Sequence, residues 1–358
     1  MKRDFRSHPL RVLVFGAGAI GSYIGGSLAL HGNQVVFIEQ PEIAARLRKS
    51  GLHLEIGDQR YHLPEPQVEP SIAEAMKLPG FDIALFSLKS FDTAAALEGM
   101  RPFSALLPPI LCLQNGVDNE PAIEKALGAG KVIAGTVTSA VGRRGAGDIV
   151  LERLRGMGVA AGSPISPLLV DALDQAGLNA RLFPHAAAMK WSKLVTNLPA
   201  NTTSAILDMT PAEVFAHPGL YALEIAQLRE ALAVMRAQDI PVVDLPGTPV
   251  RLFAFAIRRL PLSISHLVLP RAVGGGRGAK MPSFHIDLHS GRGVSEVTYL
   301  NGAVVRAGEK NGVPTPANRL LTSTLEDLVK GKMPLSALRG KPERLLQLYA
   351  SAGPGTTP

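Results

Sequence analysis

The sequence predicts two domains, an α/β N-terminal domain built on a parallel sheet and an all-α C-terminal domain. Two observations lead to this prediction. Short apolar runs alternate with helix-like stretches in the first half of the chain, and long segments with helical spacing fill the second half. Strands that alternate with helices form a parallel sheet that is covered on both faces.

The length and composition agree with two globular domains. The chain has 358 residues, of which 46% are hydrophobic and 19% charged, as is typical of sequences that form packed cores. We place the domains at residues 1–182 and 183–340, with a C-terminal tail at residues 341–358. Cys112 is the only cysteine, and no Cys/His cluster has metal-ligand spacing. We therefore expect a metal-free protein in a reducing compartment, the cytoplasm.

The charge favours small anionic ligands. The net charge is +7, and a basic surface attracts anions, including nucleic acid. The Lys and Arg residues are scattered, however, and accompany no nucleic-acid-binding motif. We expect an enzyme with anionic ligands and no nucleic-acid partner.

The N-terminal elements follow one another in a regular order. A buried strand is expected at residues 11–15, where a short apolar run ends at glycine, and a helix at residues 19–30. Further apolar runs predict four more strands, and the stretches between some of them predict two more helices. The strands are expected at residues 35–38, 83–87, 110–113 and 132–137, and the helices at residues 70–77 and 119–127.

Residues 12–30 contain no charge and follow basic residues, which is also typical of a signal peptide or a membrane helix. Five glycines in this stretch fit a strand, a tight turn and a closely packed helix better. The apolar stretch at residues 252–269 is broken by Arg258, Arg259 and Pro261. We therefore predict no membrane span.

The second half is predicted to be mainly helical. Pro199 should kink the first helix or break it near Val195. A glycine-rich basic loop is expected at residues 270–282, and whether its residues 274–278 close over a ligand is open. The stretches 219–238 and 252–262 fit either a core or the interface of a homodimer. The predicted helices cover residues 186–206, 219–238, 296–310 and 318–329.

A glycine-rich turn lies between the first strand and the first helix. It has the G-x-G-x-x-G pattern, whose first glycine permits the tight turn and whose second lets the backbone approach a pyrophosphate. The third lets helix and strand pack closely, and free N–H groups at the helix N-terminus favour an anion. The pattern predicts a Rossmann-type dinucleotide site. Its residues are Gly16, Ala17, Gly18, Ala19, Ile20 and Gly21.

Glu39 ends the second predicted strand, 18 residues after Gly21. An acid at this place typically holds the ribose 2′-OH and repels a 2′-phosphate, which favours NAD over NADP. A surface acid one residue out of register is the alternative. Arg46, Arg48 and Lys49 lie downstream and are placed to receive a phosphate instead.

Lys89 and Asn115 follow two predicted strands, at residues 83–87 and 110–113. Carboxyl ends of strands in an open parallel sheet face the ligand crevice. Both residues are thus candidate contacts to the cofactor, and Asn115 to the substrate as well. Ordinary loop polarity is the alternative.

Lys193, Asn197 and Asn201 are four residues apart, which puts them on one face of a continuous helix. Polar groups among apolar neighbours are costly unless they meet a ligand or each other. A solvent-facing stripe on an amphipathic helix explains the spacing equally well.

Glu296 and Ser283 are further candidates for a site. Glu296 begins a helix-like segment and shares its face with apolar residues such as Leu300 and Val304. Acids are also ordinary first-turn residues that complement the helix dipole. Ser283 follows the glycine-rich loop and either binds a carboxylate or caps a helix.

These motifs, in this order, resemble the ketopantoate reductase (2-dehydropantoate 2-reductase) family from about residue 10 to residue 329. The later motifs are more specific than the glycine pattern. The matching pieces are GAGAIG at 16–21, SLK at 87–89, LQNG at 113–116, WSKLVTN at 191–197 with Asn201, PSFHID at 282–287, SEVTYLNG at 295–302 and VPTP at 313–316.

The resemblance implies a Rossmann-type domain followed by a domain like the C-terminal domain of 6-phosphogluconate dehydrogenase. It implies hydride transfer from NADPH to the ketone carbon of ketopantoate, giving pantoate for pantothenate and coenzyme A synthesis. The catalytic lysine of the family falls on Lys193 and not on Lys190, and it would act as general acid. Glu296 matches the glutamate that binds the substrate hydroxyl and helps to place the lysine.

The resemblance also implies binding residues. Asn197 and Asn201 match asparagines that bind substrate, and Ser283 matches a serine that contacts the substrate carboxylate. Asn115 matches an asparagine at the boundary between cofactor and substrate.

The chain departs from the family pattern at three places. Gln40 stands where the family usually carries a basic residue for the 2′-phosphate, which with Glu39 favours NAD. The interval from Asp287 to Glu296 is one residue longer than usual, and Pro199 and the GGGRG loop are unusual. A paralogous NAD(P)-dependent reductase of another small 2-oxo acid is therefore the alternative. A non-catalytic dinucleotide-binding protein is a third hypothesis. The proton donor Lys193 disfavours it, because a protein that only binds a dinucleotide does not need one.

Overall fold

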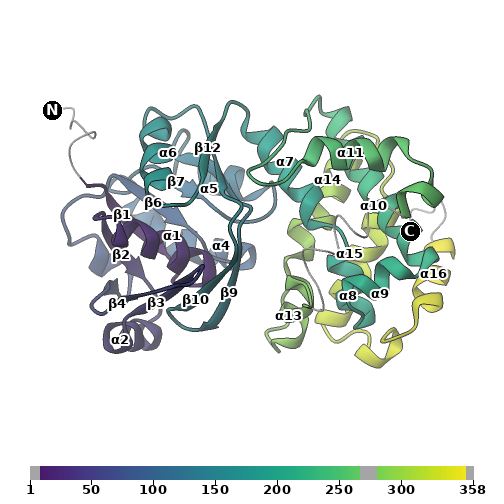
Figure 1. Ribbon diagram of the computed structural model, residues 1–358, viewed down its shortest axis with the longest axis horizontal. Helices are drawn as coiled ribbons and strands as arrows, with labels where there is room; N and C mark the ends of the chain where they lie inside the picture. Colours follow the sequence, from purple (N-terminus) through teal and green to yellow (C-terminus); the bar gives the residue numbers. More distant parts are fainter. Residues whose placement is uncertain (1–8, 267–279, 352–358) are drawn as a thin grey trace. The chain divides into compact units, whose positions relative to one another are not determined.

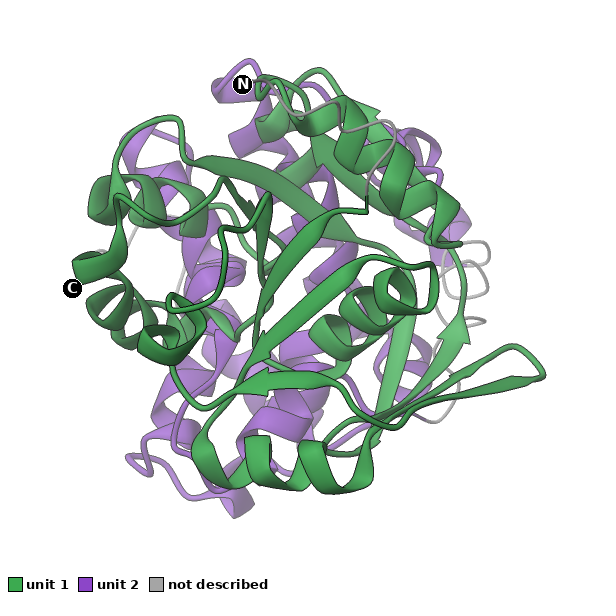
Figure 2. Cartoon of the chain, turned by 90° about the vertical axis from the view of Figure 1, so that its left-hand side faces the viewer, with its two compact units in different colours: residues 1–190, 245–248 green, residues 191–244, 249–358 purple. Residues whose placement is uncertain are grey.

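The computed structural model describes residues 9–266 and 280–351 and contains two compact units (Figure 1). Unit 1 runs to Lys190 and includes Leu245–Thr248, and unit 2 contains the remaining described residues (Figure 2). The sequence analysis placed the boundary at residue 182, where the pattern turns helical. The difference arises because the first turns of α7 (Ala186–Asn197) belong to unit 1.

Unit 1 contains an eight-stranded sheet with the order β12-β11-β8-β7-β6-β1-β2-β5. Neighbouring strands are parallel except β8 and β11, which are antiparallel. All five predicted strands are confirmed, as β1, β2, β6, β7 and β8. The strands are β1 (Arg11–Phe15), β2 (Gln34–Ile38), β5 (Gln67–Glu69), β6 (Ile83–Phe86), β7 (Ile110–Cys112), β8 (Val132–Val137), β11 (Met157–Ala160) and β12 (Ala180–Phe183).

A second sheet of unit 1 has four strands in the order β4-β3-β10-β9. The central strands are parallel and the two outer pairs are antiparallel. The sequence analysis missed this sheet because its strands include polar sequences such as QRYHL, which form no apolar run. The strands are β3 (Leu52–Ile56), β4 (Gln59–Leu63), β9 (Ala140–Gly145) and β10 (Asp148–Arg153).

Helix α1 (Ala19–Leu30) contacts both sheets of unit 1. A Cβ added to Gly25 would lie 2.8 Å from the ring of Phe37 in the first sheet. One added to Gly26 would lie 2.7 Å from a methyl group of Leu54 in the second sheet. The glycines therefore let a helix without charge pack closely against strands on two sides, which confirms the strand, turn and helix predicted here.

Strand β1 separates two apolar cores. Val12 and Val14 lie in one core, and Leu13 and Phe15 lie in the other, because successive side chains of a strand point to opposite faces. The predicted helix at residues 70–77 is shorter in the structure. The other helices of unit 1 are α2 (Pro41–Ser50), α3 (Ile72–Ala75), α4 (Thr93–Met100), α5 (Asn119–Leu127) and α6 (Ser166–Gln175), with 3-10 turns η1 (Ser90–Asp92) and η2 (Arg101–Phe103).

Every element within the described part of unit 2 is helical, which confirms the predicted all-α half. Helix α10 is the longest and contacts α9, α11, α14, α15 and α16. The helices are α8 (Asn201–Leu207), α9 (Pro211–Ala216), α10 (Pro218–Ala237), α11 (Val250–Arg259), α13 (Ser283–His289), α14 (Asn301–Lys310), α15 (Pro316–Val329) and α16 (Pro342–Ser351), with 3-10 turns η3 (Glu296–Tyr299) and η4 (Leu335–Ala337).

The helix expected at residues 186–206 is two helices, α7 and α8, with a break at residues 198–200. Pro199 lies inside the break, as its ring requires, although the break comes later than expected near Val195. Ala200 has a left-handed backbone with φ of 54°, so the chain changes direction before Asn201.

The predicted tail is partly folded. Helix α16 packs on α10 and α15, and Leu345 is fully buried there. The sequence analysis ended the second domain too early, because a short helix after a turn-rich stretch carries little pattern of its own.

Three other expectations concern surfaces. Helix α10 is largely buried and belongs to the core, whereas Leu252 and Phe255 of α11 are 67% and 59% exposed. The homodimer interface expected for these stretches stays a prediction.

Within residues 9–266 and 280–351, none of the helices combines the length and apolar character of a bilayer crossing. The loop at residues 274–278 lies outside the described residues.

Candidate active site

The glycine-rich turn has the geometry of an anion site. Gly16 has φ of +90°, and a Cβ on Gly21 would lie 1.9 Å from the carbonyl oxygen of Gly16. A Cβ on Gly18 would meet no heavy atom of the described residues within 4 Å. Gly21 is thus needed for packing, whereas Gly18 leaves open space at the N-terminus of α1. This space and the N–H groups of the helix fit a pyrophosphate.

The carboxylate of Glu39 contacts the same turn. The N–H of Ala17 donates to Glu39 Oε1 at 2.5 Å, and the N–H of Gln40 donates to Oε2 at 3.2 Å. A negative charge therefore stands beside the turn, at the end of β2. Among the downstream basic residues, Arg48 donates to the carbonyl of Val68 and is engaged there.

The loops that follow β6 and β7 are joined. The carbonyl of Asn115 accepts hydrogen bonds from Ser90 Oγ at 3.1 Å and Asn119 Nδ2 at 2.7 Å. Lys89 directly precedes η1, which contains Ser90. The structure thus brings the segments of Lys89 and Asn115 together, as the parallel sheet predicts.

Lys190 supports the loop after β7. Its Nζ donates to the carbonyl of Gln114 at 2.6 Å and lies 2.7 Å from Glu120 Oε1. The side chains of Lys190 and Glu120 are only 6% and 14% exposed. Burial disfavours the charge on Lys190, but Glu120 and Cys112 together more than offset burial and raise the pKa of the lysine. Lys190 is thus engaged in holding the residue before Asn115, a role that the sequence did not indicate.

The lysine and the asparagines of unit 2 lie on two helices. Lys193 and Asn197 are one turn apart on α7, and both are half-buried. Asn201 begins α8, so the prediction of one continuous helix face is wrong for this residue because of the break at Pro199. Asn201 is nonetheless next to Asn197, since its Nδ2 donates to the Asn197 carbonyl at 3.2 Å.

Asn201 also contacts the start of α13. Its Nδ2 donates to Ser283 Oγ at 3.4 Å, and its Oδ1 accepts the N–H of Phe284 at 3.1 Å. Pro282, and not Ser283, is the N-cap of α13. Ser283 is exposed, while Asn201 is buried. Ser283 is thus brought next to Asn201, which lies 82 residues earlier in the sequence and also contacts the Asn197 carbonyl.

Glu296 is buried at 3% exposure and begins a 3-10 turn, η3, rather than the α-helix expected over residues 296–310. Ser295 is its N-cap and accepts the N–H of Val297 at 3.3 Å. The α-helix begins later, at Asn301. Because η3 contacts α13 and α15, Glu296 belongs to the same group of helices as Ser283.

A fully buried acid, Glu224 of α10, fixes the break before α8. Its Oε2 accepts the N–H of Ala200 at 2.7 Å and Gln227 Nε2 at 2.6 Å, and its Oε1 accepts Thr203 Oγ1 at 2.5 Å. These hydrogen bonds hold the left-handed residue directly before Asn201. Glu224 is therefore a positioning residue that the sequence analysis missed.

Asn301 extends this network to α14 and α15. Its Oδ1 accepts Thr202 Oγ1 at 2.7 Å, and its Nδ2 donates to Gln227 Oε1 at 2.9 Å and to Asn318 Oδ1 at 3.0 Å. In the sequence, this network is visible only as polar residues within apolar helices. Such a pattern does not identify the partners of those residues.

The groups in unit 2 suit a small polar ligand. A lysine can donate a proton, and amide and hydroxyl groups can orient a carboxylate or a carbonyl. Unit 1 offers an anion site of dinucleotide-binding type.

Comparisons with known proteins agree with both units. The family model described as ketopantoate reductase PanE/ApbA matches residues 12–162, and its C-terminal counterpart matches residues 186–329. The 2-dehydropantoate 2-reductase of Halobacterium salinarum is 28% identical over 337 residues, covering 90% of this chain and 98% of the relative. That of Lactococcus lactis is 26% identical over 338 residues, covering 90% and 100%.

Solved structures agree as well. A PanE/ApbA family ketopantoate reductase from Ralstonia eutropha has a TM-score of 0.75 and 28% identity, covering 90% of this chain and 99% of that one. D-mandelate dehydrogenase with NADH and anilino(oxo)acetate has the same fold, with a TM-score of 0.72, 22% identity and the same coverage. The fold and the family define an NAD(P)H-dependent oxidoreductase of oxo acids. The chain belongs to the ketopantoate reductase family.

Proposed function

We propose that this protein reduces ketopantoate, a 2-oxo acid, to the hydroxy acid pantoate. The observation that carries the proposal is the position of Asn201, which is hydrogen-bonded to the Asn197 carbonyl and to Ser283 Oγ. These are three of the residues that the family motifs assign to substrate, and they come from three helices. Relatives that cover nearly the whole chain are named 2-dehydropantoate 2-reductase.

The residues of unit 2 supply the proton and the orientation. A bound nicotinamide supplies the hydride that adds to the ketone carbon. Lys193 donates a proton from Nζ to the ketone oxygen, so the C=O bond becomes a C–OH group. Glu296 binds the substrate hydroxyl, and Ser283 binds the carboxylate. Glu224 and Asn301 hold the break before α8 and α8 itself, the helix that begins with Asn201.

The proposed cofactor is NADH. The Glu39 carboxylate beside the glycine-rich turn would repel a 2′-phosphate and could exchange its hydrogen bond with Ala17 for one from the ribose. The proposal also extends to Lys89 and Asn115, whose loops border the carboxyl ends of β6 and β7.

The test is a steady-state assay of ketopantoate reduction with NADH and NADPH in parallel, followed by loss of cofactor absorbance. We expect turnover with both and a higher kcat/KM with NADH. Glu39→Arg should shift the kcat/KM ratio at least about tenfold toward NADPH, equivalent to about 1.4 kcal/mol. Glu42→Arg, an equal charge change at an exposed position of α2, should leave the ratio unchanged.

Each part of the proposal can fail separately. No turnover from protein that binds a dinucleotide would reject ketopantoate and favour a paralogous reductase of another 2-oxo acid. That alternative is supported by the glycine-containing turn before Glu296, where the interval exceeds the family spacing by one residue. An unchanged cofactor ratio in Glu39→Arg would show that Glu39 does not face the ribose.

A further inference from the structure

Asp208, His285 and His289 of unit 2 form a group outside the candidate active site. Ligand-type atoms of the three side chains all lie within 4.8 Å of one another. His285 Nε2 is 2.7 Å from Asp208 Oδ1, and the two imidazole rings have centroids 4.2 Å apart. Among the residues described, this is the one group of three His, Cys, Asp or Glu side chains with such spacing.

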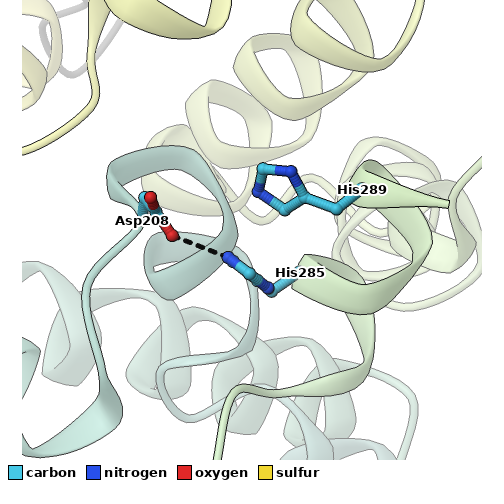
Figure 3. A group of neighbouring side chains, drawn as sticks. All are labelled: Asp208, His285 and His289. Atoms are coloured by element: carbon cyan, nitrogen blue, oxygen red, sulfur yellow. Dashed lines mark hydrogen bonds and ion pairs between the residues drawn. The ribbon is translucent and has the colours of Figure 1, made fainter. Parts of the chain in front are cut away.

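The backbone places the three side chains together. His285 and His289 are four residues apart on α13, so both project from one side of the helix toward Asp208 (Figure 3). Asp208 is the C-cap of α8 and has a left-handed φ of 52°. The sequence analysis found no metal-ligand cluster because one member lies 77 residues before the histidines begin.

The second oxygen of Asp208 has its own partner. Arg339 Nη2 lies 2.8 Å from Asp208 Oδ2, while Oδ1 faces His285. In metal sites the oxygen that does not bind the ion is commonly held by an outer hydrogen bond, which orients the carboxylate. Arg339 fits this outer role and leaves Oδ1 directed at the histidines.

We propose that Asp208, His285 and His289 bind a divalent first-row transition ion such as Zn²⁺. Two imidazoles and a carboxylate are ligands that such ions prefer. Tetrahedral Zn²⁺ with bonds of about 2.1 Å separates its ligand atoms by about 3.4 Å. His285 Nε2 and Asp208 Oδ1 would therefore move apart by under about 1 Å. The exposed side of His289 leaves a fourth position for water.

The ion would connect two helices that carry candidate substrate residues. Asn201 begins α8 and Ser283 begins α13, and these residues already contact each other. Asp208 follows the last residue of α8, and His289 is the last residue of α13. Metal would therefore fasten the end of α8, about 10 Å from its first residue, to α13 at His285 and at its last residue, His289. The inference does not depend on the proposed substrate.

The test uses the full chain without a polyhistidine tag, freed of metal by a chelator. Zn²⁺ is titrated by calorimetry, and Co²⁺ by its visible d–d absorption. We expect one ion per chain, a higher Tm with Zn²⁺, and Co²⁺ absorption typical of nitrogen and oxygen ligands. His289→Ala, a change at an exposed position, should weaken binding by at least about tenfold, as should His285→Ala.

A second histidine pair provides the matched control. His53 and His62 stack in unit 1 with centroids 4.3 Å apart, and both are exposed. His62→Ala should leave Zn²⁺ affinity and stoichiometry unchanged. Failure of the wild-type chain to bind one Zn²⁺ would overturn the proposal. So would equal losses in His62→Ala and His289→Ala, or unchanged binding in folded His285→Ala/His289→Ala protein.

Discussion

Two lysines on α7, Lys190 and Lys193, have different surroundings although they are only three residues apart. Lys190 is buried between Glu120 and the Gln114 carbonyl, whereas Lys193 is half-buried in unit 2. Sequence spacing alone does not distinguish them. The family motif predicts that Lys193 is the proton donor. In the structure, Lys190 instead pairs with Glu120 and holds the Gln114 carbonyl.

The two lysines should respond differently to replacement by alanine. Lys190→Ala should lower the free energy of unfolding by about 3–5 kcal/mol, because Glu120 is left buried without its cation. Lys193→Ala should abolish ketopantoate turnover with a much smaller effect on stability. Denaturant unfolding and steady-state kinetics measure the two effects.

A double variant tests the cause of the Lys190 effect. Lys190→Met/Glu120→Leu removes both charges and should recover much of the stability lost in Lys190→Ala. The raised pKa of Lys190 means that the pair stabilises fully below the ordinary lysine pKa, and that this contribution falls only as pH rises through the higher folded pKa. Equal stability losses at Lys190 and Lys193 would contradict the assignment.

Among the helices and strands, those with a regular apolar pattern were predictable. Strand β1 and helix α1 begin and end where the sequence indicated. The second sheet was missed because strands such as β4 are polar and mostly exposed. The break between α7 and α8 was placed too early, because hydrogen bonds from Glu224 fix its position and the sequence does not reveal them.

The glycine-rich turn gives a test with two neighbouring glycines. Gly21→Ala should lower the free energy of unfolding by about 1–3 kcal/mol through its clash with the Gly16 carbonyl. Alanine is otherwise the better helix former, so without the clash this change would stabilise. Gly18→Ala should leave stability within about 0.5 kcal/mol but weaken NADH binding at least about tenfold, about 1.4 kcal/mol.

Thermal unfolding and a fluorescence titration with NADH separate these two effects. Unchanged NADH binding in Gly18→Ala would show that the pyrophosphate does not approach Gly18. A stable Gly21→Ala protein would mean that α1 can shift away from the turn.

For the chain as a whole, the sequence predicted the division into an α/β and an all-α part, and the candidate cofactor and substrate residues were named from motifs, spacing and strand ends. It could not predict which of them touch. Asn201 and Ser283 are 82 residues apart, and their contact depends on how α8 and α13 pack. The buried network through Asn301 likewise joins distant helices.

Helix α16, which lies past residue 340 in unit 2, gives a test of how much it contributes to the core. Leu345→Ala should cost about 2–5 kcal/mol in the free energy of unfolding, because the side chain is fully buried. Leu348→Ala on the same helix, with 37% exposure, should cost about 0.5 kcal/mol or less. Denaturant unfolding measures both. Equal, small losses would show that α16 adds little to the core.

The four residues Leu245–Thr248 return the chain to unit 1 in the middle of unit 2. There the carbonyl of Pro246 accepts Thr138 Oγ1 at 2.8 Å. A single recombination between the coding regions of the two halves would therefore pair Thr138 from one parent with Pro246 from the other. Because unit 1 consists of residues 1–190 and 245–248, its transfer as an intact module needs three recombination points, after codons 190, 244 and 248.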